Sequence, residues 1–338
     1  MNTIRGVTTV YSDVTAQQFE EEIRPRNRPA ILKGLVRDWP SVQAGLQSPG
    51  ILAAYLKQMD VGVPVDSLAA RAESGGRFFY SDDLRGFNFQ KTRGTLSAFL
   101  DRLLASSAET QAPALYVQSA PVQIHLPRFH AEHRNPVLEP AITPRIWIGN
   151  SVTATTHSDM ASNLACVVAG CRRFTLFPPE QLKNLYIGPL EYSPSGRPVS
   201  MVDLQNPDFE RFPRFVDALA AAEVAELEAG DAIYVPYYWW HHVRSLSSFN
   251  VLINYWWNDG AADSVSPYES MMIALLTIRD LPEAQRAIWR DVFDHYIFMQ
   301  DGDPAAHLPP DRRGVLGPIT PQHRAHIKTV VAKLLSSS

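Results

Sequence analysis

Two widely separated motifs carry side chains of the kind that bind a divalent metal. His157 and Asp159 are two residues apart, so in an extended strand both side chains leave the same face. The segment GDAIYVPYYWWHH, residues 230–242, ends in His241 and His242. Two histidines and one carboxylate on one face of an octahedron leave three positions open, the usual arrangement in non-haem Fe(II) oxygenases. The pattern predicts an iron site built from His157, Asp159 and one of the two downstream histidines.

Two apolar segments directly follow the first motif. They are NLACVVAG, residues 163–170, and RRFTLFPP, residues 172–179, and we expect them to form a buried hairpin. Burying polar, titratable groups beside such a hairpin is costly unless a partner such as a metal ion compensates. Cys166 and Cys171 are five residues apart and so on opposite strand faces, which predicts buried free thiols rather than a disulfide or a metal pair.

Short strand patterns separated by turn residues fill the chain between residues 145 and 257. They read RIWIGN, NLACVVAG, RRFTLFPP, GDAIYVP, HHVRSL and NVLINYWW. Many short strands at this spacing are typical of a sandwich, a barrel or a jelly roll. The sequence therefore predicts a mainly β fold for the part of the chain that holds the metal motifs.

Elements outside this β region are predicted from caps and periodicity. In the first part of the chain, Thr15 begins a capping box for a short helix that buries Phe19 and Ile23. The other elements expected there are a strand at 29–34, mostly loop over 60–94, a helix at 95–104, a strand at 113–119 and irregular chain over 120–140. Three helices are expected after residue 260, starting at Ser266, at 283 and at Thr320. We therefore divide the chain into a β domain, 1–260, and a helical region, 261–338.

A histidine-rich segment, HLPRFHAEH, spans residues 125–133. Zinc binding is one interpretation of its three histidines. The segment has no cysteine and no regular ligand spacing, and a proline interrupts it, so the favoured interpretation is a solvated or substrate-facing loop.

Composition and charge restrict the classes of partner. The 338 residues are 45% hydrophobic and carry a formal net charge of -4, which favours neither a nucleic acid nor an anionic membrane as partner. There is no run of 18 apolar residues and no apolar signal region near the start, so the expectation is a soluble, cytoplasmic protein.

The shared motifs give the chain a resemblance to a known family. They are HSD (157–159), GCRRFTLFPPEQ (170–181), NPDFERFP (206–213), GDAIYVP (230–236) and WWHH (239–242), with a looser match at PAILKGLVRDWP (29–40). The chain resembles the cupin-fold, JmjC-type Fe(II)- and 2-oxoglutarate-dependent dioxygenases, and within them most resembles the branch of the asparaginyl hydroxylase that inhibits hypoxia-inducible factor. NPDFERFP is the segment that is typical of that branch.

The resemblance implies a fold, a metal site and a co-substrate anchor. The fold is a double-stranded β-helix with flanking helices, and the Fe(II) ligands are His157, Asp159 and His241, with His242 on the other strand face. The anchor for the far carboxylate of 2-oxoglutarate, a lysine in most relatives, corresponds here to Arg172. Arginine binds a carboxylate bidentately but is not equivalent to lysine. The alternative is that Arg172 points outward and Arg173 inward.

Other co-substrate contacts are carried over by position. Tyr116 matches a tyrosine that supports the same carboxylate, and Asn163 and Asn254 match asparagines that line the site. For the two asparagines, hydrogen bonding at a strand end is the simpler alternative. Ala154 stands where close relatives have a threonine that donates to the co-substrate. Thr153 and Thr155 are its possible replacements, and we assign Thr155.

The resulting hypothesis is a 2-oxoglutarate-dependent hydroxylase acting on a C–H bond of a protein side chain or of an amino-acid-like small molecule. Two alternatives remain, a metal-dependent cupin enzyme that does not use 2-oxoglutarate and a non-catalytic cupin that serves as a binding module. Similar C-terminal helices in the related branch form a dimer interface, so the resemblance also implies a homodimer through residues 261–338. The alternative is that the apolar stripes of these helices pack against the wall of the barrel.

Overall fold

The structure is a computed structural model that describes residues 4, 6–107, 109–260 and 266–336. It divides into two compact units, Met1–Asn258 and Asp259–Ser338. The boundary expected after residue 260 adjoins residues 261–265, which lie outside the described residues. Among the described helices, none is both long enough and apolar enough to cross a lipid bilayer.

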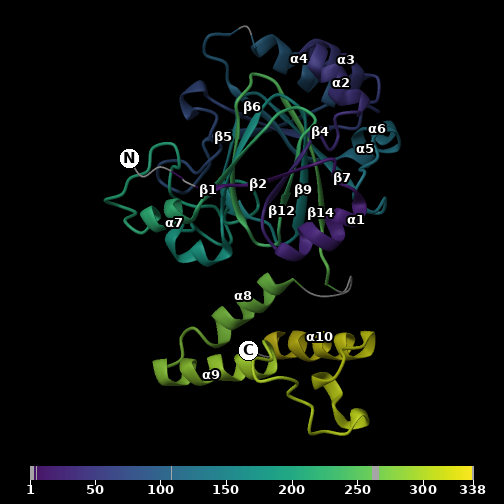
Figure 1. Ribbon diagram of the computed structural model, residues 1–338. Helices are drawn as coiled ribbons and strands as arrows, with labels where there is room; N and C mark the ends of the chain where they lie inside the picture. Colours follow the sequence, from purple (N-terminus) through teal and green to yellow (C-terminus); the bar gives the residue numbers. More distant parts are fainter. Residues whose placement is uncertain (1–3, 5, 108, 261–265, 337–338) are drawn as a thin grey trace. The chain divides into compact units, whose positions relative to one another are not determined.

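Two β-sheets form the first unit (Figure 1). The five-stranded sheet has the order β1 (Gly6–Val7), β11 (Glu223–Leu227), β10 (Arg172–Phe177), β13 (Trp240–Ser245) and β8 (Thr153–Ser158). The nine-stranded sheet has the order β2 (Thr9–Ser12), β3 (Ala30–Lys33), β12 (Ala232–Val235), β9 (Ser162–Ala169), β14 (Asn250–Trp257), β7 (Pro144–Gly149), β6 (Ala114–Pro121), β4 (Val65–Ala70) and β5 (Phe89–Gly94). The predicted mainly β, jelly-roll class is confirmed.

Strand β9 shows why this sequence forms two layers of core. All eight of its residues are buried, as expected for a central strand covered on both faces. Leu164, Cys166 and Val168 pack into a core under the helices, while Ala165 and Val167 face the opposite sheet. The period of two along β9 therefore places Asn163 on the inner face, toward the space between the sheets.

An apolar core lies between the two sheets. Its members come from both sheets: Ile31, Ala165, Val167, Phe174, Leu176, Ala225, Leu227, Ile233, Val235, Trp239 and Leu252. Beyond these residues the inner faces carry polar side chains as well as a smaller apolar cluster. Burial of apolar side chains thus joins the sheets, and a pocket with both polar and apolar lining lies beside this core.

Helices cover the outer face of the nine-stranded sheet. They are α1 (Ala16–Gln18) with the π-helical turn Phe19–Ile23, α2 (Pro40–Gln47), α3 (Pro49–Lys57), α4 (Leu96–Ser106), α5 (Val122–His125) and α6 (Pro127–Glu132), and α7 (Phe215–Ala221) lies by the other sheet. Thr15 caps α1, and Phe19 and Ile23 are buried as predicted. Figure 1 shows α2, α3 and α4 grouped together.

The predicted hairpin of residues 163–179 is wrong. Strand β9 belongs to the nine-stranded sheet and β10 to the five-stranded one, so they do not pair. Gly170 makes the crossing with φ +77°, and a Cβ there would lie 2.7 Å from the carbonyl oxygen of Phe249. Only glycine combines that conformation with that closeness of approach. Residues 163–179 therefore contribute one strand to each of the two sheets, rather than a hairpin to one sheet.

Two further predictions of irregular chain fail. Residues 60–94, expected to be mostly loop, contain β4 and β5, which pair with each other at the edge of the larger sheet. Residues 120–140, expected to be irregular, contain α5 and α6. Strand β5 reads FQKTRG and has five exposed residues in six, so it has no apolar pattern to predict it.

The second unit is helical. It contains α8 (Pro267–Thr277), α9 (Glu283–Tyr296), two short 3₁₀ turns at Pro310–Arg312 and Gly314–Leu316, and α10 (Pro321–Ser336). Ser266 caps α8 by accepting a hydrogen bond from the backbone N–H of Tyr268, 3.2 Å away. The three helices predicted after residue 260 are present.

We predict that Gly170→Ala destabilises the first unit more than Gly62→Ala does. Both glycines have positive φ, so each alanine bears the left-handed cost of about 1–2 kcal/mol. Gly62 has open space around its Cβ position, whereas Gly170 does not, which adds about 1–3 kcal/mol of overpacking. Urea denaturation of both variants measures the difference, and equal losses would contradict the role given to the crossing.

Candidate metal and co-substrate site

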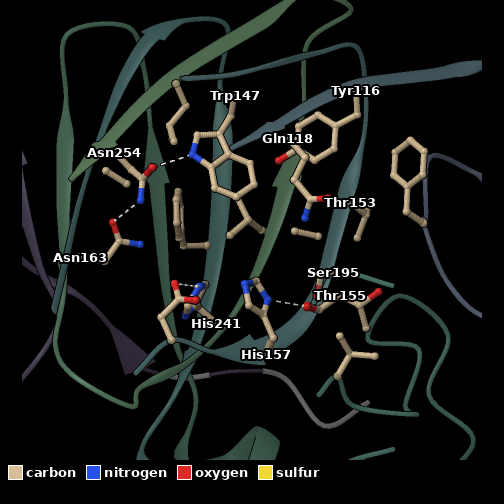
Figure 2. A pocket seen from close by; sticks show the side chains of 18 of the residues that line it. Tyr116, Gln118, Trp147, Thr153, Thr155, His157, Asn163, Ser195, His241 and Asn254 are labelled. Atoms are coloured by element: carbon tan, nitrogen blue, oxygen red, sulfur yellow. Dashed lines mark hydrogen bonds and ion pairs between the residues drawn. The ribbon is translucent and has the colours of Figure 1, made fainter. Parts of the chain in front are cut away.

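A pocket lies between the two sheets and gathers most of the residues singled out in the sequence (Figure 2). Its lining includes Tyr116, Gln118, Trp147, Thr153, Thr155, His157, Asp159, Asn163, Arg172, His241, Asn254 and Trp256. These side chains come from both sheets. All eight residues assigned from the sequence line this one pocket.

Pairing of β8 with β13 places two of the candidate ligands opposite each other. His157 is the register partner of His241, and their ring centroids are 4.4 Å apart. Asp159 follows directly after the end of β8. One possible ligand atom from each of the three residues lies within 4.8 Å of the other two. The three side chains therefore converge closely enough to share one ion.

Backbone carbonyls fix which nitrogen each histidine presents. Nδ1 of His157 lies 2.8 Å from the carbonyl oxygen of Thr155, and Nδ1 of His241 lies 3.0 Å from that of Trp239. A carbonyl oxygen can only accept, so each Nδ1 carries the proton and donates. Each Nε2 is then left with its lone pair, which is the form that binds a metal.

The carboxylate of Asp159 is held by a neighbouring strand. The indole N–H of Trp256 in β14 donates to its Oδ2 over 3.1 Å, and the same oxygen lies 3.6 Å from Nε2 of His241. Burial and the adjacent His157 lower the pKa of His241, against the opposing effect of Asp159. His241 is thus neutral near neutral pH, as a ligand must be.

The second member of the histidine pair lies elsewhere. His242 is buried but does not line the pocket, and burial with the nearby cation of Arg77 lowers its pKa to about 3. In β13, alternation of side chains sends His241 and His242 to opposite faces. The structure brings His241, and not His242, to the other two ligands.

Arg172 is a buried cation in the same pocket. Its exposure is 3%, and its Nε and Nη2 atoms have no hydrogen-bond partner. Among the described residues no carboxylate pairs with it, and the group beside it is the hydroxyl of Tyr116, which opposes the lowering of its pKa by burial. Arg173 is exposed and pairs with Glu226. The inward residue is therefore Arg172, as expected.

The remaining assigned residues form the pocket wall. The hydroxyl of Thr155 is buried without a partner, whereas that of Thr153 lies 3.5 Å from the amide nitrogen of Gln205. Asn254 donates to Asn163 over 3.1 Å. Of the two threonines, Thr155 is thus the one whose hydroxyl is available to donate to a ligand. The two asparagines bond to each other, which differs from the simpler alternative of hydrogen bonding at a strand end.

These contacts fit the implied groups. The donor set of two imidazoles and a carboxylate suits a divalent transition metal with open positions. The unpartnered nitrogens of Arg172 and the unpartnered hydroxyl of Thr155 are buried donors, which are costly without an acceptor. A ligand that bears a carboxylate would supply that acceptor.

Three pocket residues were missed in the sequence. Gln118 lies two residues after Tyr116, Trp256 lies two after Asn254, and Trp147 donates its indole N–H to Asn254 over 2.7 Å. Figure 2 shows Trp147 beside Asn254 and Gln118 near Tyr116. Gln118 and Trp256 could have been predicted, because side chains two residues apart in a strand share a face.

His125 and His133, two of the three histidines of residues 125–133, are buried and have structural contacts, so the favoured interpretation of a solvated or substrate-facing loop is wrong for these two. Nε2 of His133 accepts the backbone N–H of Ser41 over 3.2 Å, and its ring stacks on Phe129. Nδ1 of His125 lies 3.2 Å from the carbonyl oxygen of Val63. Among the described residues, the group that can hold a metal is His157, Asp159 and His241, so the zinc interpretation finds no support. Both cysteines are free, as predicted, but only Cys166 is buried, whereas Cys171 is half-buried.

The fold and the site together define a cupin-type protein with a candidate metal site between its sheets. Residues 16–263 match the cupin-like domain family, and the chain belongs to that family. It is 27% identical to lysine-specific demethylase JMJ31 of Arabidopsis thaliana over 74% of this chain, and spans only about half (50%) of that protein. It is 25% identical to tRNA wybutosine-synthesizing protein 5 of Gallus gallus, over 81% of this chain and 88% of that protein.

A third relative is matched over a shorter region. HSPB1-associated protein 1 of Homo sapiens is 34% identical over 42% of this chain and 30% of that protein. These relatives support the cupin and JmjC family. They do not support the finer placement in the branch of the asparaginyl hydroxylase.

We predict that Trp256→Phe weakens metal binding by about 10–100-fold, because the carboxylate of Asp159 loses the donor that orients it. Trp257→Phe is the matched control, since the indole N–H of Trp257 is buried without a partner. Titration of the metal-free protein with Mn(II) measures both. Equal affinities in the two variants would contradict the orienting role.

Proposed function

We propose that the protein is an Fe(II)- and 2-oxoglutarate-dependent oxygenase that hydroxylates a C–H bond of a protein side chain or of an amino-acid-like small molecule. The observation that carries the proposal is the buried Arg172, which has no carboxylate partner among the described residues and lies in the same pocket as His157, Asp159 and His241. A dicarboxylate accounts for both the three ligand side chains and the buried arginine. One end would bind the metal that the three side chains hold, and the other end would bind Arg172.

His157, Asp159 and His241 would hold Fe(II), and Arg172 the far carboxylate of 2-oxoglutarate. When bound, iron and 2-oxoglutarate supply the oxidising chemistry, in which dioxygen converts the substrate C–H to C–OH while 2-oxoglutarate becomes succinate and carbon dioxide. The protein contributes ligand geometry and exclusion of water. Nδ1–H bonds to the backbone keep both imidazoles in the ligating tautomer.

The wall residues complete the co-substrate pocket. The hydroxyl of Tyr116 stands beside the guanidinium of Arg172, so the two can serve the same carboxylate. Thr155 offers its free hydroxyl from the ligand strand β8. Asn163 and Asn254 form an amide pair, braced by Trp147, that limits the pocket on the side of the nine-stranded sheet.

The names of the relatives indicate different substrates, a lysine for one protein and a tRNA base for another. Our proposal takes neither substrate. The net charge of -4 gives the chain no electrostatic attraction for a polynucleotide, which supports a protein or small-molecule substrate instead.

Two alternatives differ in what they expect of Arg172. A metal-dependent cupin enzyme without 2-oxoglutarate requires the metal ligands but no dicarboxylate. A non-catalytic binding module requires neither, and leaves the convergence of three ligand side chains without a reason. The burial of Arg172 beside Tyr116 favours the oxygenase over both.

We predict that 2-oxoglutarate binds the metal-loaded protein and that Arg172→Gln weakens this binding by at least about tenfold, because a charge-assisted, bidentate contact is lost. Arg173→Gln is the matched control, since Arg173 is exposed and pairs with Glu226. Anaerobic calorimetric titration with Fe(II), then with 2-oxoglutarate, measures both steps. Metal binding without 2-oxoglutarate binding in the wild type would instead favour a cupin enzyme that uses another co-substrate.

We further propose that residues 259–338 form a homodimer interface. Helices α8 and α9 bury no residue, and the exposed fractions of Leu276, Ile288 and Phe298 are 71%, 61% and 64%. Apolar surface of this extent calls for a covering partner, and a second copy of the helical unit offers the same apolar surface in return.

We predict that the wild type is a dimer in light scattering and that Ile288→Glu shifts it toward the monomer, because a charge in the interface is not compensated. Leu46→Glu, at an exposed position of α2, is the control and should leave the mass unchanged. A monomeric wild type would refute the dimer without bearing on the metal site.

A further inference from the structure

A second cavity adjoins the metal site and holds two arginines that the reaction scheme leaves unused. Its lining shares His157, Asp159, Trp147, Trp256, Gln118 and Ser195 with the metal pocket and adds Arg145 and Arg197. We propose that Arg145, assisted by Arg197, binds a carboxylate group of the substrate. This inference rests on the proposed function and names the substrate class for it.

Arg145 is held at one side of its guanidinium and open at the other. Its Nε donates to the hydroxyl of Ser119 over 2.6 Å and lies 3.1 Å from the carbonyl oxygen of the same residue. Its guanidinium carbon lies 5.8 Å from the ring of Trp256. Within the described part of the chain, its two terminal amino groups have no hydrogen bond or ion pair. A guanidinium oriented this way presents two parallel donors, the geometry that matches a carboxylate.

The residue that orients Arg145 has an unusual backbone. Ser119 has φ 55°, in the left-handed region that a serine rarely adopts. It lies where the register of β6 against β7 shifts, between Val117 and Ala120. This irregularity turns both the carbonyl and the hydroxyl of Ser119 toward Arg145. Strained residues of this kind cluster at binding sites, because the surrounding structure must enforce them.

The side chains that line the two cavities carry an excess of positive charge, which favours an anionic substrate group. The lining residues carry one carboxylate, Asp159, against three guanidinium groups, Arg145, Arg172 and Arg197. With a divalent metal and dianionic 2-oxoglutarate in place, Asp159 and the co-substrate together offset the metal and Arg172. The charges of Arg145 and Arg197 then remain, and an anionic substrate group is their complement.

The geometry also indicates where on the substrate the carboxylate lies. Trp256 contacts Arg145 through its ring and binds the metal ligand Asp159 through its N–H, so one side chain borders both sites. The carboxylate is therefore close to the C–H bond that reacts, as in a free amino acid, an amino-acid derivative or an acidic side chain. A cationic lysine side chain, by contrast, would face two arginines.

The test measures binding rather than turnover, on the full chain loaded with Zn(II) and saturating 2-oxoglutarate. The probes are 3-phenylpropionate and its amide, which match in size and differ in charge, and saturation-transfer NMR gives their dissociation constants. We expect the carboxylate to bind at least about tenfold more tightly than the amide. Arg145→Gln should abolish this preference, and Arg145→Lys, which keeps the charge and loses the fork, should retain only part of it.

Arg244→Gln is the matched control, because Arg244 is an exposed arginine of β13 outside both cavities. It should keep the full preference, and all variants should keep the wild-type affinity for 2-oxoglutarate. The inference is overturned if the wild type does not bind 3-phenylpropionate, binds acid and amide equally, or keeps its preference in Arg145→Gln. Failure of 2-oxoglutarate to bind the wild type would instead overturn the proposed function.

Discussion

The pairing of β8 with β13 is the constraint on which the site depends. It sets His157 directly opposite His241, although the two strands are far apart in the sequence. Because neighbouring strands lie about 4.8 Å apart, residues opposite each other can share one ion without any change in the backbone. The third ligand, Asp159, needs only to follow the end of the same strand. Metal geometry is thus a consequence of sheet register rather than of a flexible loop.

Burying polar side chains costs free energy, and the buried guanidinium of Arg172 is the clearest case in this pocket. Arg172 shares the inner face of β10 with Phe174 and Leu176, which belong to the apolar core between the sheets. Burying a guanidinium among such neighbours without an anionic partner costs about several kcal/mol. An anionic ligand that reaches this cation would therefore bind and stabilise the folded chain together.

Strand β14 links the separate parts of the pocket. Its inner face carries Asn254, which pairs with Asn163 and accepts from Trp147, and Trp256, which binds Asp159 and borders Arg145. Alternation along one strand thus joins the asparagine pair, the candidate metal ligand Asp159 and the adjoining cavity that holds Arg145. A change in this strand is felt at all three, since none of the side chains can move without breaking a hydrogen bond.

Sequence alone determined the common face of His157 and Asp159, from their spacing within one strand, and the mainly β class of fold, from the repeated short strands. The structure decided that Arg172, rather than Arg173, faces inward. Resemblance, not spacing, selected His241 from its pair. Only the tertiary structure decided which strands meet. It separated the expected hairpin at Gly170 into two sheets and brought Ser119 to orient Arg145. Period and capping are local properties of the chain, whereas pairing between distant strands depends on a free energy summed over the whole core.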